Sequence, residues 1–199
     1  TTLLQITGNI KVKEALENLV KLFLSNFLDN ESGHYGLFFD EKWSLQSPVI
    51  SFVHDIEAAW LLIEAAKMVG DSTLIAQTTE AAIFVADKFL EEAYVENKGV
   101  SNEKNLVTGK IDFDRHWWPQ VEAMMGLHYA FNISGDKKYK TAILDIWNFT
   151  QNNLIDRENG EWFFRVDQSN RPYTQDKLSM WKTPYHNCRT LMRLIKETQ

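Results

Sequence analysis

The sequence predicts an all-α protein of the α/α-toroid class, built as three helical hairpins in a single domain over residues 1–199. One pattern recurs about every 64 residues, at 27–43, 89–105 and 154–170. In each copy a helix-like stretch ends, acidic residues and a glycine follow, and the segment reaches a charged turn. A Gly-Asp turn after an apolar helix occurs at Gly70 and again at Gly135. Two independent markers therefore share one period.

Each period begins with an amphipathic helix, expected at 10–28, 74–92 and 137–155. In the first of these, apolar side chains follow helical spacing, at Ala15, Leu19, Leu22 and Phe23. Such a stripe covers one face only, so these helices are expected to form the outer wall.

A turn-rich excursion leads in each period to a second and more apolar helix, expected at 54–69, 118–133 and 185–197. Pro119 and Pro184 lie at or near the first turns of two of these helices, and Gly70 and Gly135 lie just past two C-termini. The second helices are expected to line the inside of the ring.

The structural alternative is an open solenoid of short helical repeats, in which 34 residues make one hairpin. Each period here holds one hairpin and a long aromatic excursion, whereas a doubled short repeat would hold four compact helices. The toroid is therefore favoured. Loops that enter its inner helices converge on one face, so functional residues are expected within 52–60, 114–126 and 180–191.

The composition argues against several classes of function. A net charge of -6, with no Lys/Arg cluster, argues against nucleic acid. Cys188, the only cysteine, makes an internal disulfide impossible and indicates a reducing, cytoplasmic setting. No apolar run has the length of a membrane span, so no membrane partner is expected. Seven Trp residues reflect core packing or sugar stacking.

The three junctions have a distinctive sequence. HDIEAAWLL at 54–62, WWPQVEAMMGLHYAF at 117–131 and WKTPYHNCR at 181–189 resemble, in order and spacing, signature segments of the N-acylglucosamine 2-epimerase family and its cellobiose 2-epimerase branch. The resemblance covers nearly the whole chain. It implies half of an (α/α)6 barrel and a small sugar substrate, epimerised at C2 with no cofactor and no metal.

The resemblance also implies roles for single residues. His54 and His186 match the acid/base histidines of that family, and Trp118 and Trp181 match its sugar-stacking tryptophans. Glu57 matches a polar contact beside the first histidine. Thr183 departs from the cysteine that cellobiose enzymes commonly carry.

Epimerisation next to an aldehyde needs these residue types. The sugar ring opens, one base removes the C2 proton, and a second group returns a proton to the opposite face of the enediolate. Histidine suits both roles because an ordinary imidazole titrates near neutral pH. Glu57 is i+3 from His54 and shares its helix face, where it is expected to orient the imidazole or hold a sugar hydroxyl. An aldose–ketose isomerase would use the same enediolate.

Other polar and aromatic residues near the junctions have structural interpretations. His34, His116 and His128 are expected to be caps or surface residues, Trp117 a core residue and Arg115 a loop charge. Glu122, i+4 from Trp118, either faces the substrate or bonds a neighbouring helix end. A glycoside hydrolase is an alternative because this fold also carries paired carboxylates, with candidates Asp55, Glu57, Glu122 and Asp176.

Full family members have about twice this length, and the first half supplies another histidine and an arginine. The resemblance therefore leaves open a catalytically incomplete fragment that acts as a helical interaction module. Exposed inner helices would invite self-association, so a homodimer is a possible state.

Overall fold

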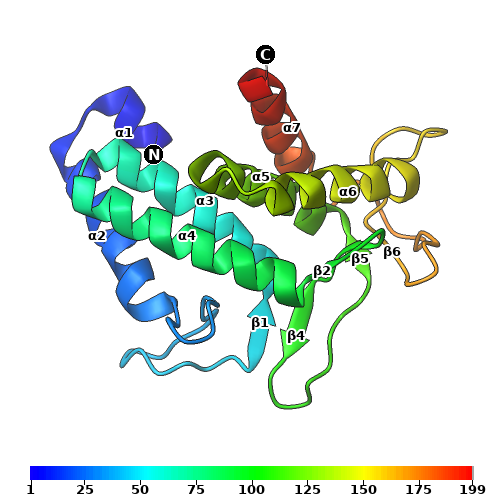
Figure 1. Ribbon diagram of the computed structural model, residues 1–199, viewed down its shortest axis with the longest axis horizontal. Coiled ribbons are helices and arrows are strands. Elements are labelled where there is room, and N and C mark those ends of the chain that lie inside the picture. Colours follow the sequence, from blue (N-terminus) through cyan, green and yellow to red (C-terminus); the bar gives the residue numbers. More distant parts are fainter. Residues whose placement is uncertain (199) are drawn as a thin grey trace.

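A computed structural model describes residues 1–198, where inner and outer helices alternate along the chain (Figure 1). The inner helices are α3 (Phe52–Val69), α5 (Trp117–Ser134) and α7 (Tyr185–Thr198). The outer helices are α2 (Ile10–Leu22), α4 (Ser72–Glu92) and α6 (Lys137–Asn153). α5 packs against both α3 and α7, so the inner helices stand in chain order. The predicted half toroid is confirmed.

Sharp turns join each inner helix to the outer helix that follows it. Gly70 and Gly135 end α3 and α5 in the left-handed region, with φ of 78° and 71°. Asp71 and Asp136 then cap α4 and α6, accepting hydrogen bonds from backbone amides at 2.9 Å. The tightest antiparallel pairs are consequently α3 with α4 and α5 with α6, each inner helix followed by its outer helix.

The long excursions contain short antiparallel ribbons that the sequence did not predict. β1 (Val49–Ser51) pairs with β4 (Glu103–Asn105), β2 (Tyr94–Val95) with β3 (Gly99–Val100), and β5 (Arg115–His116) with β6 (Arg165–Val166). β1 leads directly into α3, and β5 leads into α5. The ribbons therefore fix the points at which the inner helices begin.

The first predicted helix, 10–28, changes from an α-helix to a π-helix before it ends. α2 ends at Leu22 and continues as the π-helix η1 (Phe23–Phe27), and a short helix, α1 (Thr2–Thr7), precedes it. Phe23 and Phe27 stack with ring centroids 4.6 Å apart. In the loop that follows, Tyr35 contacts the ring of Phe23 and Trp43 contacts the ring of Phe27.

The core lies between the inner and outer helices. Ile56 and Trp60 of α3 and Trp117 and Leu127 of α5 are almost completely buried, so the interpretation of Trp117 as a core residue is confirmed. At Gly126 the two helices come so close that a Cβ atom there would lie 2.8 Å from the Ile56 carbonyl oxygen. α3 and α5 form one rigid layer.

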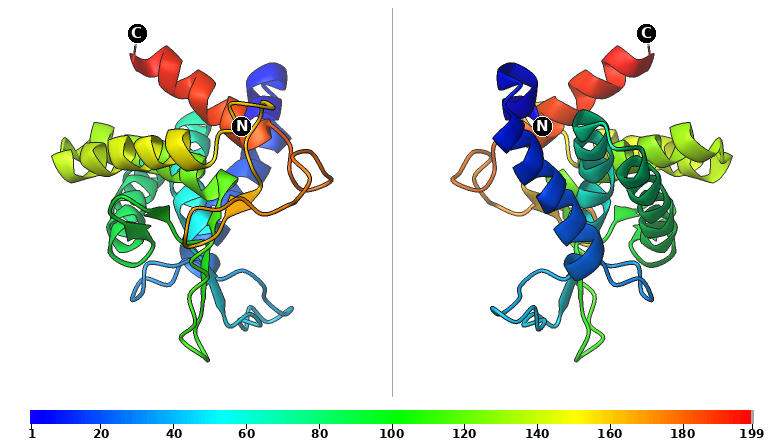
Figure 2. Two further views of the ribbon diagram at one scale, coloured as in Figure 1. Left: turned by 90° about the vertical axis from the view of Figure 1, so that its right-hand side faces the viewer. Right: turned by 90° about the vertical axis from the view of Figure 1, so that its left-hand side faces the viewer.

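α7 is different from the helix that the sequence predicted. It was expected to be as apolar as the other inner helices, but Arg189, Arg193 and Lys196 make it strongly amphipathic. One face contacts α5, and the far end projects away from the other helices in every view (Figures 1 and 2). The physical reason is that α7 packs on α5 and reaches α3 through Arg189 and Arg193, while Met192, Ile195 and Lys196 on its other side are exposed.

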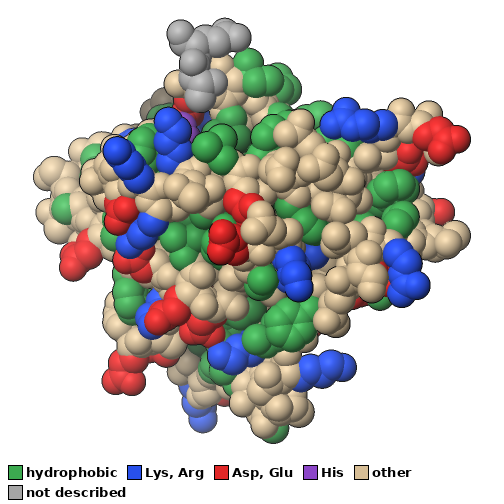
Figure 3. Space-filling view, turned by 45° about the vertical axis from the view of Figure 1, so that its right-hand side comes forward, with side chains coloured by type: hydrophobic (Ala, Val, Ile, Leu, Met, Phe, Trp, Pro, Cys, Tyr) green, Lys and Arg blue, Asp and Glu red, His purple; other side chains and the backbone are tan. Residues whose placement is uncertain are grey.

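The surface carries charges of both signs. On the face shown in Figure 3, Lys and Arg side chains are scattered among Asp and Glu and lie between hydrophobic patches. No helix among residues 1–198 combines the length and the apolar character that crossing a membrane requires.

Candidate active site

His54 lies on the first turn of α3, with its imidazole exposed. Its Nδ1 is 2.6 Å from the hydroxyl of Ser51, the last residue of β1. The ring also borders a groove of about 430 Å³ together with Glu57, Leu61 and Tyr35. His54 is thus fixed through one ring nitrogen and accessible on the other side.

Trp118 stands between the two predicted catalytic histidines. Its ring centroid is 5.1 Å from that of His54 and 5.2 Å from that of His186. The three side chains come from the first turns of α3, α5 and α7. The N-termini of the inner helices therefore converge as the toroid requires, and both imidazoles contact one indole.

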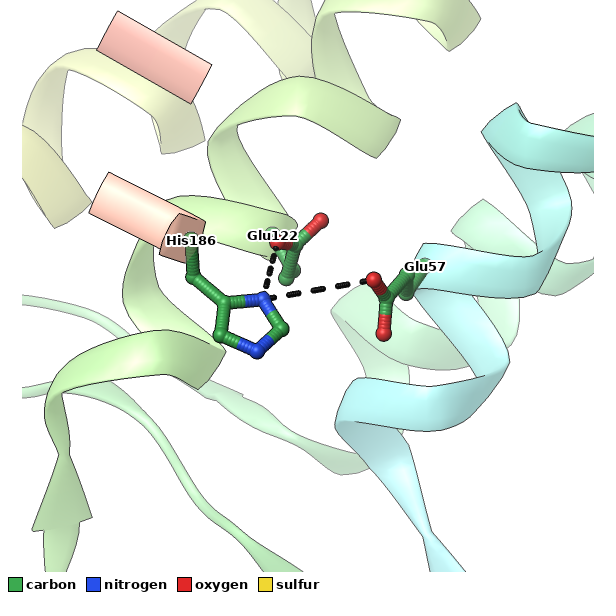
Figure 4. A group of neighbouring side chains, drawn as sticks. All are labelled: Glu57, Glu122 and His186. Carbon is green, nitrogen blue, oxygen red and sulfur yellow. Dashed lines mark hydrogen bonds and ion pairs between the residues drawn. The ribbon is translucent and has the colours of Figure 1, made fainter. Parts of the chain in front are cut away.

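A hydrogen-bonded cluster holds His186. Its Nδ1 lies 2.7 Å from Oε1 of Glu122 and 4.0 Å from Oε1 of Glu57 (Figure 4). The carboxylate of Glu122 is fully buried, and its Oε2 accepts a hydrogen bond from Trp60 Nε1 at 3.1 Å. Because a carboxylate can only accept, Glu122 keeps a proton on Nδ1 of His186 and directs Nε2 away from itself.

Arg189 joins the two carboxylates. Its Nη2 donates to Oε1 of Glu57 at 2.7 Å and to Oε1 of Glu122 at 2.6 Å, and its guanidinium stacks over Trp60. Burial opposes the charged form, but the hydrogen bonds and charges of Glu57 and Glu122 outweigh it and raise the pKa of Arg189 above its usual range. The cluster therefore contains a permanent cation.

The same atoms have the spacing of a metal site. Glu57, Glu122 and His186 offer two oxygens and one nitrogen within 4.8 Å of one another. Arg189 already donates to both of these oxygens, so a guanidinium stands where a metal ion would bind. The donor set as arranged serves an internal cation.

Trp181, the second predicted sugar-stacking residue, lies away from this cluster. Its side chain is 81% exposed, and no ring contact joins it to the histidines within residues 1–198. The neighbouring Lys182 is completely buried, where its ammonium donates to Glu161 and to the Lys177 carbonyl and lies over the Trp117 ring. Lys182 thus anchors the loop that presents Trp181.

Two structural interpretations from the sequence are wrong. His34 is not a surface residue but is 6% exposed, with Nδ1 2.8 Å from Asp55 and Nε2 3.4 Å from Glu92. Arg115 is not a free loop charge but is buried, donating to Ser101 and to the carbonyls of Lys98 and Phe113. His34 thus ties its excursion to α3 and α4, and Arg115 holds the excursion between α4 and α5 together.

The remaining histidines lie outside the cluster. His116 is the N-cap residue of α5, without a side-chain capping bond, and its Nε2 lies 3.4 Å from Asp112. His128 lies on α5, where its Nε2 is 2.9 Å from Glu197 of α7.

The carboxylates considered for a hydrolase are dispersed. Asp55 is buried, bonded to His34 and to the Tyr35 amide, and Asp176 lies on the exposed loop before α7. Only Glu57 and Glu122 come together, and both are bridged by Arg189. A hydrolase needs one carboxylic acid to give up a proton, which this shared guanidinium disfavours.

Sequence reasoning assigned no role to Arg189 and Lys182. Arg189 is i+3 from His186 and so lies on the same face of α7, a spacing that the sequence already contains. Nothing local marks Lys182 as buried, because its partner Glu161 is 21 positions earlier.

The fold and site together define an α/α-toroid protein whose inner helices converge on a histidine, carboxylate and arginine cluster. Residues 2–190 match the family model described as N-acylglucosamine 2-epimerase (GlcNAc 2-epimerase), and the chain belongs to this family.

Several cellobiose 2-epimerases are similar to the chain. That of Bacteroides fragilis is 40% identical over 200 aligned positions, covering 99% of this chain and 50% of the relative. That of Dictyoglomus turgidum is 36% identical over 98% of this chain and 50% of the relative. The solved structure from Bacillus thermoamylovorans B4167 superimposes with a TM-score of 0.91 at 30% identity, covering 98% of this chain and 50% of that one. The chain thus spans about half the length of these relatives.

Proposed function

We propose that this chain supplies the two-histidine half of a sugar 2-epimerase, which inverts C2 of an aldose or of the reducing-end glucose of a disaccharide. The observation that carries the proposal is the position of His54 and His186, on different inner helices but both against Trp118. Two bases around one stacking surface suit a reaction that moves a proton between the two faces of one carbon.

The chemistry follows from these positions. One imidazole takes the C2 proton of the open-chain sugar, and the electron pair moves into C1–C2 while the C1 oxygen becomes negative. The resulting cis-enediolate accepts a proton at C2 from the other imidazole, on the opposite face. The reverse direction exchanges the two roles, so no redox cofactor is needed.

The surrounding residues hold this arrangement. Trp118 offers a flat apolar surface to the sugar, and Glu57 a carboxylate to a hydroxyl. Glu122 orients His186, and Arg189 neutralises both carboxylates so that neither competes for the proton. Trp181, exposed on its loop, contacts the part of a longer sugar outside the reacting ring.

A disaccharide is favoured as substrate because the relatives that are 40% and 36% identical to this chain are cellobiose 2-epimerases. Aldose–ketose isomerisation is the second candidate, since it uses the same enediolate. A D-mannose isomerase of Marinomonas mediterranea is 25% identical over 72% of this chain. The two reactions differ in whether the proton returns to C2 or C1.

The test is incubation of the protein, in its longest natural form, with cellobiose and with mannose in deuterated water. We expect deuterium at C2 and a C2 epimer. His54→Ala and His186→Ala should each lower kcat at least about 100-fold, and His128→Ala, outside the cluster, should not. A released monosaccharide, or activity lost only in Glu57→Gln and Glu122→Gln, would instead identify a hydrolase.

We also propose a cellular compartment and an oligomeric state for the protein. The exposed thiol of Cys188 fits a reducing cytoplasm. Exposed apolar side chains such as Leu19, Leu61 and Met192 favour a homodimer, which light scattering would detect as a doubled mass.

A further inference from the structure

Ser51 is the N-cap residue of α3, but its side chain does not cap the helix. Serine at this position ordinarily accepts a hydrogen bond from a backbone amide of the first turn. Here the hydroxyl lies 2.6 Å from Nδ1 of His54 instead. The side chain that would ordinarily cap the helix is bonded to the imidazole of His54 instead.

The hydroxyl has little freedom to move. Ser51 is buried and lies opposite Glu103 in the β1–β4 ribbon, and its neighbours Ile50 and Phe52 belong to the hydrophobic core. The backbone on both sides of the hydroxyl is therefore held by pairing and packing, and the exposed ring of His54 has one fixed partner.

The contact selects the reacting atom. With Nδ1 engaged by Ser51, only Nε2 of His54 remains for a substrate. The hydroxyl accepts from Nδ1–H when Nε2 is the bare base, and it still accepts from Nδ1–H after Nε2 has taken a proton, because the ring is then an imidazolium with both nitrogens protonated. Glu122 accepts from Nδ1 of His186 in the same way, but it does so as an anion.

We propose that Ser51 is a positioning residue for His54, which presents Nε2 to the sugar and accepts a hydrogen bond from Nδ1–H both before and after Nε2 takes up a proton. The proposal rests on the proposed function, since it assigns Ser51 a task in the proton transfer by His54. It also makes the two histidines unequal: Nδ1–H of His54 is bonded to a neutral hydroxyl, and Nδ1–H of His186 to an anion.

The kinetic test compares Ser51→Ala with Ser51→Thr, which restores a hydroxyl at the same backbone position. A ring that is free to turn misplaces Nε2 by about an ångström, so Ser51→Ala should lower kcat about 10- to 100-fold. KM should stay within about twofold, because a positioning residue does not touch the sugar. Ser51→Thr should recover most of the loss.

Ser101→Ala is the matched control. Ser101 is another buried serine with one hydroxyl bond, to Arg115, and it has no contact with His54. It should leave kcat unchanged while it reports what loss of a buried hydroxyl does to folding. A kcat loss equal to that of Ser51→Ala would assign Ser51 a purely structural role and overturn the proposal.

A readout independent of activity is the ¹⁵N spectrum of the histidine rings, with His54 assigned through His54→Gln. The Nδ1 resonance of His54 should move in Ser51→Ala and return in Ser51→Thr, while that of His186 stays in place. A His54 resonance that ignores Ser51→Ala would overturn the proposal even in an active enzyme. Absence of epimerase activity in the wild type would contradict the proposed function instead, and the spectrum would still show whether Ser51 holds the ring.

Discussion

α3 and α5 are held together in a different way from α7. The first two pack through apolar side chains and a close approach of Gly126 to Ile56. α7 also packs Leu191 and Leu194 on the core. In addition it makes ion pairs, with Arg189 bonded to Glu57 and Glu122, and Arg193 bonded to Glu64. The apolar pair supplies a rigid support for His54 and Trp118, and charged contacts then bring His186 to it. α7 therefore joins the site through both apolar packing and ion pairs.

The largest effect is expected from Arg189→Met, which removes the cation that bridges the layers. It leaves Glu122 buried without its counter-charge, which costs on the order of 3 kcal/mol in the free energy of unfolding. We also expect kcat to fall at least about 100-fold, because the carboxylates can then compete for protons. Urea unfolding and C2 deuterium exchange measure the two effects.

Arg193→Met is the control for that change. Arg193 also joins α7 to α3 and lies over Trp60, but its pair with Glu64 is partly exposed. Its loss should cost about 1 kcal/mol or less. Equal losses in the two variants would mean that α7 docks by general charge attraction rather than through the buried cluster.

Gly126→Ala tests the apolar half of the comparison. The added Cβ would lie 2.5 Å from the Ile56 side chain and 2.8 Å from its carbonyl oxygen, so the two helices must separate. We expect a loss of about 1–3 kcal/mol, measured by thermal unfolding. Adding Ile56→Val should recover part of it, and a Gly126→Ala protein as stable as the wild type would show that the layer can shift.

Trp60→Phe tests the link between the two halves. The ring stays, but Oε2 of the buried Glu122 loses its hydrogen bond from Nε1. An acceptor left without a partner costs about 1–3 kcal/mol. Trp147→Phe, in a partly buried side chain of α6 that packs on the core, controls for the change in ring size. A loss no greater than the control would show that water replaces the indole.

The smallest expected effect is a pH dependence carried by His34. Burial opposes its charged form, but the hydrogen bond to Asp55 and the charge of Glu92 outweigh it and raise the pKa of His34 above 6.5. The folded protein then keeps a proton that the unfolded chain releases. The resulting stability is fully present below the unfolded pKa and is lost as the pH rises through the folded one.

Denaturant midpoints at pH 6 and pH 8 should therefore differ less in His34→Gln than in the wild type. His128→Gln is the control, because that histidine pairs with Glu197 outside this network. If His34→Gln retains the whole wild-type difference, another group carries it.

The helices were predictable because their signals are local. Gly70, Gly135 and the apolar spacing placed α3 and α5 within two residues of their ends. His54, Trp118 and His186 could be placed at one face for the same reason, since each follows directly from where an inner helix begins. The roles assigned to His54, His186 and Trp181 stay predictions.

The rest depends on contacts between distant residues. Arg189 is 132 positions from Glu57, and His34 is 58 positions from Glu92, so neither pair leaves a periodic trace in the sequence. For α7 the prediction was wrong about the polarity of the helix. Its inner position is set by ion pairs together with Leu191 and Leu194, whereas the prediction assumed a helix as apolar as α3 and α5.

The buried ammonium of Lys182 allows the opening of the loop before α7 to be measured directly. An amine enclosed by Glu161, a carbonyl and an indole cannot react with an acylating reagent while the loop is closed. Its labelling rate, read by mass spectrometry, would report how often the segment with Trp181 lifts off. The exposed Lys42 provides an internal reference for the rate of acylation. Slower labelling of Lys182 with a sugar present would show that ligand binding keeps the loop closed.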